Sequence, residues 1–306
     1  MRAHQLCLLF TVILTISCHS NSSDDDSTKD PSPDSIPKTI TQYSPSAKEV
    51  EIREKHHELI YKTILIQTFY FSKPLDLGAA FLVKKNNFYY LATNYHLLAG
   101  CEPTDTSIIR SKTGEIPNEI HICLHTKSDI PFYFSAPLYQ NGNRTFISIP
   151  PDLERLKATP REVSDLVFLP LGPNYRENVR MDTSAMSENN EVIKKDDLIA
   201  FFGFRNANIV EKQFPIVDTA KVTYSIFRKP IYSNKGKFIF FNAHKPFEGN
   251  SGCPVYIEIN NKLRFIGIVS GKNNIPKFFS DNSANQMLGN IISKSFIHYA
   301  LEKYVP

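Results

Sequence analysis

One tight turn near residue 250 constrains the fold and the chemistry of this chain more than any other segment. Residues Phe247–Val255 read FEGNSGCPV, so Ser251 lies between glycines, with a proline and an apolar run directly behind it. Glycine at position 249 lets the backbone bend without a Cβ atom in the way. A turn of this kind presents a serine as a nucleophile. A Gly-x-Ser-Gly segment alone is a common turn, however, so the interpretation depends on partner residues elsewhere in the chain.

Two further segments carry side chains that complete a nucleophilic site. Leu91–His96 reads LATNYH after an aromatic run, and Ser164–Leu169 reads SDLVFL at the head of an apolar run. A serine hydroxyl is a poor nucleophile until a neighbouring imidazole takes its proton, and the imidazole needs a carboxylate to fix its tautomer. The residue types therefore predict His96 as the base, Asp165 as the orienting carboxylate and Ser251 as the nucleophile.

The three segments together resemble the landmarks of the trypsin-like (chymotrypsin-fold) serine peptidases of bacterial type. These landmarks are a Thr-x-x-His segment, an Asp at the head of an apolar strand, and a Gly-Asp/Asn-Ser-Gly-x-Pro turn. The order His, Asp, Ser differs from that of the α/β-hydrolases and of the subtilisins. The resemblance covers roughly residues 60–306. It implies that the N–H groups of Gly249 and Ser251 form an oxyanion hole, and that the site lies in a cleft between two barrels.

The fold class that the resemblance implies is all-β, with two antiparallel six-stranded β-barrels, a short N-terminal helix and a C-terminal helix. Ser46 and Glu49 suit the start of a helix over residues 47–61, and Ser293–Val305 has apolar residues at helical spacing. Short apolar runs between turns predict strands. They cover Thr63–Phe71, Gly78–Val83, Phe88–Thr93, Glu119–His125, Phe132–Ala136, Leu166–Leu169, Leu198–Phe204, Ile216–Tyr224, Lys237–Asn242, Val255–Ile259 and Arg264–Ser270. The predicted domain, residues 47–306, has its first barrel at about 60–172, a linker at 173–197 and its second barrel at 198–306.

The first residues of the chain predict export. The apolar run Leu6–Ile16 is too short to span a bilayer as a helix, but it has the length of a signal-peptide core. The run ends just before Cys18, in a sequence that resembles a relaxed bacterial lipobox. Residues 1–17 are therefore predicted to be a signal peptide, with Cys18 as the lipidated residue and the membrane as a partner through that lipid. Plain cleavage nearby, for example after Ser20, is the alternative, and it would give a secreted protein instead of a membrane-anchored, surface-facing lipoprotein.

Composition separates the leader region from the rest of the chain. Residues 18–46 are rich in Ser, Asp, Pro and Thr and nearly devoid of large apolar side chains, which predicts a disordered tether. The whole chain of 306 residues is 42% hydrophobic, an ordinary globular composition. Its formal net charge of +4 is not concentrated in a basic run interleaved with aromatic residues, so nucleic acid is not predicted as a partner.

The resemblance also indicates which residues would contact a protein or peptide substrate. Lys245, six residues before the nucleophile, corresponds to the base of the primary specificity pocket, and Ser270, Gly271 and Lys272 correspond to the strand beside it. A lysine in the pocket would favour an acidic substrate side chain. The alternative places Lys245 in a loop, pointing to solvent. Lys272 replaces the glycine that is usual at the pocket wall. The sequence does not identify the natural substrate.

The cysteines and histidines are candidates for other chemistry. Cys101 and Cys123 can pair in an oxidising compartment, although nothing in the sequence fixes their separation. Cys253 takes the place of the second glycine of the usual motif and is interpreted as structural. His121, Cys123 and His125 alternate along one predicted strand, as zinc ligands would on one face. No fourth ligand lies at a recognisable spacing, so neither a metal nor another cofactor is predicted.

Three classes of function follow from these residues. The first is an exported serine endopeptidase that cleaves peptide bonds by a His-Asp-Ser triad through an acyl-enzyme. The second is a catalytically weak or inactive trypsin-like module that acts as a surface binding lipoprotein. The third is a zinc-dependent or purely structural surface protein. The presence of all three triad residue types favours the first class, because a binding module has no need of them.

Overall fold

A computed structural model describes residues 45–103, 105–111, 113–125, 131–150, 164–172, 193, 194, 196–204, 215–227, 237–242, 249–274 and 287–306. All of them belong to one compact unit, Ser44–Pro306. The predicted signal peptide, almost all of the predicted tether and most of the predicted linker lie outside the described residues. Within the described part of the chain, the helices are too short or too polar to cross a membrane.

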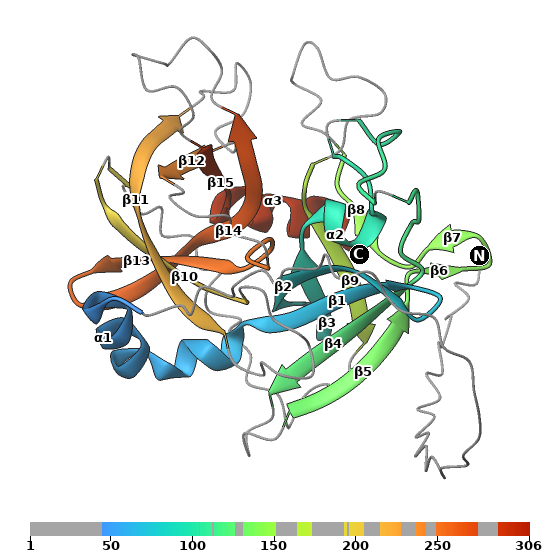
Figure 1. The fold of residues 1–306 in the computed structure, drawn as a ribbon, viewed down its shortest axis with the longest axis horizontal. Helices are drawn as coiled ribbons and strands as arrows, with labels where there is room; N and C mark the ends of the chain where they lie inside the picture. The colour runs from blue at the N-terminus through green and yellow to red at the C-terminus, as the bar shows by residue number, and fades with distance from the viewer. Residues whose placement is uncertain are drawn as a thin grey trace, which may run out of the picture. The chain divides into compact units, whose positions relative to one another are not determined.

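The described residues form an all-β fold with two antiparallel sheets, a short leading helix and a C-terminal helix, which confirms the fold class predicted from the sequence (Figure 1). The first sheet has the strand order β5-β4-β1-β2-β3-β9-β8. It contains seven strands instead of six, because a two-residue strand, β8, pairs with β9. Its strands are β1 (Ile64–Tyr70), β2 (Lys73–Lys85), β3 (Phe88–Thr93), β4 (Glu119–His125), β5 (Pro131–Pro137), β8 (Ile147–Ser148) and β9 (Val167–Gly172).

The second sheet closes into a six-stranded barrel with the order β10-β11-β12-β15-β14-β13. Its strands are β10 (Leu198–Gly203), β11 (Ile216–Phe227), β12 (Lys237–Asn242), β13 (Pro254–Ile259), β14 (Lys262–Asn274) and β15 (Met287–Ser293). A separate hairpin, β6 (Tyr139–Gln140) with β7 (Asn143–Arg144), completes the described strands. Closure leaves the barrel without an exposed strand edge.

Strand β3 is apolar along its length, without the usual alternation of apolar and polar side chains, because both of its faces are covered. Tyr90 and Ala92 pack into a core shared with the second barrel, whereas Tyr89 and Leu91 pack into the interior of the first sheet. Successive side chains of a strand point to opposite faces, so a strand that is covered on both faces must be apolar throughout. This double burial fixes β3 firmly, and β3 leads directly to His96.

The leading helix α1 (Ala47–Lys55) packs on the second barrel, although it precedes the first sheet in the chain. Ser46 caps it, and Glu49 completes the capping box while its other carboxylate oxygen accepts the Thr219 N–H of β11 at 3.2 Å. Lys48 and Lys55 both contact Glu258 of β13, at 3.2 and 3.1 Å. The 3₁₀ helix η1 (His57–Lys62) then leads the chain to β1.

The C-terminal helix α3 (Lys294–Tyr304) begins at Ser293, whose side chain caps the Phe296 N–H. Its other end is held by Lys85 of the first sheet. The Lys85 ammonium donates to the carbonyl oxygens of Leu301 and Glu302 at 3.0 Å and of Val305 at 2.7 Å. The last carbonyl groups of a helix lack partners within it and carry partial negative charge, so an ammonium group suits this place.

We expect Lys85→Met to destabilise the fold by about 2 kcal/mol, because three carbonyl groups at the end of α3, two of them on buried residues, lose a charged donor. The exposed neighbour on the same strand, Lys84, provides the control: Lys84→Met removes the same charge and should cost under about 0.5 kcal/mol. Urea unfolding followed by circular dichroism measures both. Equal stability of the two variants would contradict the importance of this contact.

Candidate active site

His96 is presented by a sharp change from strand to helix. β3 ends at Thr93, Asn94 is the N-cap residue, and helix α2 (Tyr95–Ala99) begins directly afterwards. The Thr93 hydroxyl donates to the Ala79 carbonyl of β2 at 2.7 Å, and the Asn94 side chain donates to the Asp165 carbonyl at 3.0 Å. Sequence reasoning used Thr93 only as part of a motif and gave Asn94 no role. The structure shows that both residues fix the start of α2, and with it the imidazole.

Asp165 lies against His96 and makes three polar contacts with it. Its Oδ1 lies 2.9 Å from the His96 Nδ1 and accepts the His96 backbone N–H at 3.1 Å. Its Oδ2 lies 3.0 Å from the same Nδ1. Both side chains are largely buried, at 4% exposed for His96 and 9% for Asp165, so solvent screens this contact little. The structure therefore brings together two of the three residues predicted for the triad.

The carboxylate determines which tautomer of the imidazole is present. An ionised aspartate only accepts hydrogen bonds, so the proton of a neutral His96 ring is assigned to Nδ1. The Nε2 atom then carries a free lone pair and can accept a proton from another group. This is the arrangement that general-base chemistry needs.

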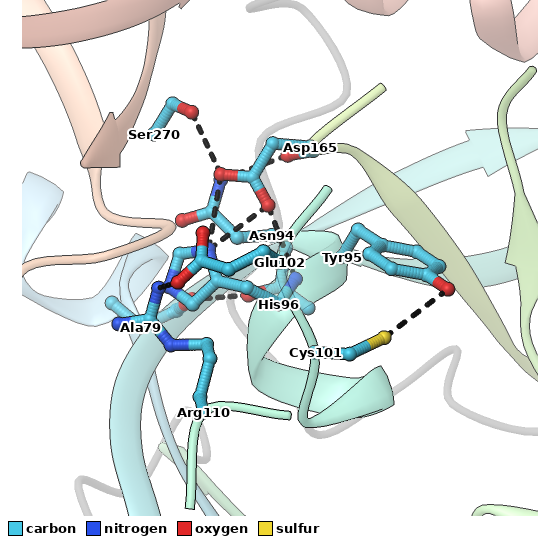
Figure 2. Close-up of polar contacts among 10 residues, drawn as sticks. Ala79, Asn94, Tyr95, His96, Cys101, Glu102, Arg110, Asp165 and Ser270 are labelled. Carbon is cyan, nitrogen blue, oxygen red and sulfur yellow. Dashed lines mark hydrogen bonds and ion pairs between the residues drawn. The ribbon is translucent and has the colours of Figure 1, made fainter. Parts of the chain in front are cut away.

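A third group holds Asp165 from the second barrel. The Ser270 hydroxyl, on β14, donates to the Asp165 Oδ2 at 2.7 Å, and Figure 2 shows Asp165 between Ser270 and His96. The sequence placed Ser270 beside the substrate but did not predict this contact. With this hydroxyl, each of the two carboxylate oxygens has a hydrogen-bond donor in a place that solvent barely reaches. The contact also joins the two sheets at the site.

The Ser251 turn is built against the first sheet. Gly249 and Gly252 have positive φ, 89° and 81°, a conformation that favours glycine. A Cβ atom on Gly252 would overlap the Ala79 carbonyl, so the turn approaches β2 as closely as backbone can. The Ala79 N–H donates to the Ser251 carbonyl at 2.8 Å, and the Gly252 N–H donates to the Val269 carbonyl of β14 at 2.8 Å.

These contacts place the Ser251 turn beside the His96 segment. A Cβ atom on Gly78 would lie 3.0 Å from the Ser251 carbonyl oxygen and would also overlap Leu97, the residue that follows His96. Ser251 itself is partly exposed. No hydrogen bond joins the Ser251 hydroxyl to the His96 ring in this structure, although both residues are described. Catalytic hydrogen bonds are often long without substrate and shorten when it binds.

The two backbone groups predicted for an oxyanion hole lie on the same turn. The Gly249 carbonyl accepts the Phe204 N–H at 3.2 Å, and the Asn250 carbonyl accepts the Cys253 N–H at 3.1 Å. Among the residues that the structure describes, no acceptor is assigned to the N–H groups of Gly249 or Ser251. As far as the described residues show, both N–H groups are therefore available to an external acceptor.

Two buried side chains near the site are kept neutral. Burial, with the nearby Asp218 carboxylate as a second cause, raises the pKa of the Cys253 thiol well above its usual value, so the thiol is a packing group and not a nucleophile. Burial also raises the pKa of Tyr95 to about 12, with a contribution from its contact with Cys101. Cys101, Cys123 and Cys253 are all free thiols, so Cys101 and Cys123 are not paired.

The remaining predicted residues are placed unevenly. Lys245 lies outside the described residues. Gly271 and Lys272 lie on β14, where their partners on β15 are Asn290 and Gly289. The side chain of Lys272 is not described. On β4, Cys123 is buried and the ring of His121 lies 3.1 Å from Glu119, whereas the His125 side chain is not described. Within the described part of the chain, no group of three His, Cys, Asp or Glu side chains is arranged to hold a metal ion.

No protein-family model matches the sequence, and no curated protein matches it. Several solved protease structures are similar. An HtrA-type protease, AlgW with a tripeptide, is 17% identical, with a TM-score of 0.45 and coverage of 84% of this chain and 62% of its own. The active form of the Rv3671c protease from M. tuberculosis is 14% identical, with a TM-score of 0.47 and coverage of 86% and 88%. A serine endoprotease from Yersinia pestis is 12% identical, with a TM-score of 0.45 and coverage of 85% and 67%.

This chain thus spans less than two thirds of the AlgW chain. Identities and scores at this level do not place it in a family. Its function is therefore proposed from the geometry of the site.

Proposed function

We propose that this protein is a serine endopeptidase, with Ser251 as nucleophile, His96 as general base and Asp165 as the carboxylate that orients the imidazole. The observation that carries the proposal is the His96–Asp165 contact of 2.9 Å, buried beside a glycine turn that presents a partly exposed serine. A His–Asp contact with only a structural role would not require a serine on a glycine turn next to it. The arrangement matches what acyl transfer needs: a nucleophile, a base and a group that orients the base.

The reaction follows from the protonation states at the site. Nε2 of His96 takes the Ser251 proton as the hydroxyl oxygen attacks the carbonyl carbon of the peptide bond. The oxyanion that forms is stabilised by the N–H groups of Gly249 and Ser251, each worth roughly 3–4 kcal/mol in the transition state. His96 then gives its proton to the leaving amine, which leaves an acyl-enzyme on Ser251. Water, activated by the same imidazole, releases the acid and restores the serine.

A fluorophosphonate probe tests this proposal directly, because it phosphonylates only a serine activated in this way. We expect the parental protein to be labelled and Ser251→Ala to remain unlabelled. Ser295 lies on α3, so Ser295→Ala serves as the matched control and should be labelled as strongly as the parental protein. Absence of labelling in folded parental protein would overturn the proposal and support the alternative function, a surface binding module.

We propose in addition that β14 forms one wall of the substrate cleft through Ser270, Gly271 and Lys272, with Lys245 at the base of the specificity pocket. Ser270 lies next to Asp165, so the strand that carries it borders the reacting groups. A cationic pocket would favour substrates with an acidic side chain before the cleaved bond. Comparison of peptides that differ only in Glu or Gln at that position tests this preference.

We also propose that the protein is exported and carries a lipid on Cys18, with the residues from His19 to the start of the compact unit as a flexible tether. Support comes from the apolar run before Cys18 and the polar, Pro-containing tract behind it. Growth with radiolabelled palmitate should label the parent, and Cys18→Ala should remove the label and move the protein to the aqueous phase of a detergent partition. Cys7→Ala, in the predicted leader, should leave both unchanged. A Cys18→Ala protein that stays membrane-bound would refute the anchor.

A further inference from the structure

A second carboxylate lies near the Ser251 turn, inside the second barrel. Asp218 on β11 is 1% exposed and pairs in register with Phe201 of β10. The next residues on the same face of β11, Ala220 and Val222, pack into the apolar core of the barrel. A carboxylate in such surroundings has lost its hydration, which costs free energy unless donors replace the water. The position of Asp218 therefore calls for a specific donor.

That donor comes from the turn itself. The Asn250 side-chain amide donates to the Asp218 Oδ2 at 3.0 Å, and Asn250 is fully buried. Asn250 directly precedes Ser251 and lies between the two residues whose N–H groups are proposed to bind the oxyanion. A hydrogen bond to a charged acceptor is stronger than one between neutral groups. The bond therefore ties the middle of the turn to the wall of the barrel.

Gly203 provides the space for this contact from the other side. A Cβ atom there would overlap the Asn250 side-chain amide, so the last residue of β10 must be small where Asn250 lies against it. The next residue, Phe204, donates its N–H to the Gly249 carbonyl at 3.2 Å. Asn250 is thus held between β10 and β11. Neither the fold of the barrel nor the triad explains why a buried carboxylate is retained at this place.

We propose that Asp218 is a positioning residue: through Asn250 it fixes the turn Gly249–Gly252, so that the N–H groups of Gly249 and Ser251 point to one oxyanion position. The inference rests on the proposed function for its catalytic meaning. In this proposal Asp218 acts on the turn through its hydrogen bond with Asn250, as a positioning residue and not as a catalytic one. Because oxyanion donors act in the transition state, loss of this support should lower kcat more than it raises KM.

A reciprocal exchange tests the pair. Asn250→Asp sets two carboxylates against each other, and we expect kcat for a peptide ester to fall by about 10²-fold to 10³-fold with KM changed by less than about threefold. Asp218→Asn keeps an acceptor for Asn250 and should lose less than about tenfold. The double variant restores one carboxylate and one amide with their positions exchanged. It should recover kcat to within about tenfold of the parent, a rescue that a general loss of stability would not produce.

Hydrogen exchange of the turn gives a readout that does not depend on activity. Followed by mass spectrometry, the peptide over residues 249–253 should exchange faster in Asn250→Asp and slow again in the double variant, while the peptide over His96 stays unchanged. Gly203→Ala displaces Asn250 from the other side and should likewise lower kcat and speed the exchange of the turn. It replaces Asn250→Asp in the test if that variant does not fold. The inference is overturned if the turn exchanges at the parental rate in these variants, or if the double variant does not recover kcat. An unreactive parent with altered turn exchange would instead refute the proposed function alone.

Discussion

Replacing Ser251 by alanine is expected to reduce the hydrolysis of casein by a factor approaching 10⁶, and His96→Ala should cost about the same. The nucleophile and its base act as one unit, so either loss removes the same step. The His96 ring cannot attack in place of the missing hydroxyl, and Ser251 cannot lose its proton without the ring. Release of labelled fragments from casein measures both variants, and circular dichroism checks that they are folded.

Two control variants replace the same residue types, a histidine and a serine, at positions outside the proposed site. His298→Ala and Ser295→Ala change a histidine and a serine on α3, away from the Ser251 turn, and should retain the parental rate. The double variant of Ser251 and His96 should be no slower than either single variant, since the losses are not additive. Casein cleavage by Ser251→Ala at the parental rate would show that the triad assignment is wrong.

The second large effect is expected for Asp165→Asn, which should reduce kcat on the order of 10⁴-fold while the fold persists. The rigid backbone N–H of His96 requires an acceptor at the Oδ1 position, so the amide oxygen takes that place and the NH₂ group faces Nδ1. The NH₂ group at the Oδ2 position, 3.0 Å from Nδ1, donates to that atom and so favours the tautomer whose ring proton lies on Nε2. An imidazole in this tautomer cannot take the proton of Ser251.

A graded comparison separates this tautomer effect from the loss of one hydrogen bond. Ser270→Ala removes a donor to the Asp165 Oδ2 but leaves the carboxylate in place, so it should cost no more than about 10²-fold. Steady-state kinetics with a small ester measure both variants at the same pH. Equal losses in Asp165→Asn and Ser270→Ala would mean that the carboxylate serves packing and not the tautomer of His96.

Local patterns in the sequence were sufficient to predict most strands and their order. β3 and β4 have the predicted bounds, because both begin and end at clear turn or polar residues. The leading helix was predicted as one element to about residue 61, but the structure ends α1 at Lys55 and continues as the 3₁₀ helix η1. Met287–Ser293, which forms β15, was not predicted as a strand. Its pairing with β12 and β14 depends on closure of the barrel, which no local pattern records.

The contacts around the site divide in the same way. The His96–Asp165 contact follows from residue types and order, so the sequence was enough to predict it. The bond from Ser270 to Asp165 joins residues 105 positions apart on different sheets, and that from Asn250 to Asp218 depends on strand register. Such contacts are determined by how the two sheets meet. Asp218 in particular reads as an ordinary surface residue until its burial in the barrel is known.

The two end helices have a consequence for the order of events during synthesis. α1 is made early but packs on β11, whose residues come much later in the chain. The Lys85 ammonium of β2 likewise finds its acceptors, the carbonyl groups near the end of α3, only when residues 301–305 have been made. Neither half can therefore finish folding as it emerges, and the fold around His96 and the Ser251 turn is fully supported only after residues 301–305 have been made. For the exported peptidase proposed above, this order of folding would keep the site inactive until the whole domain has been made.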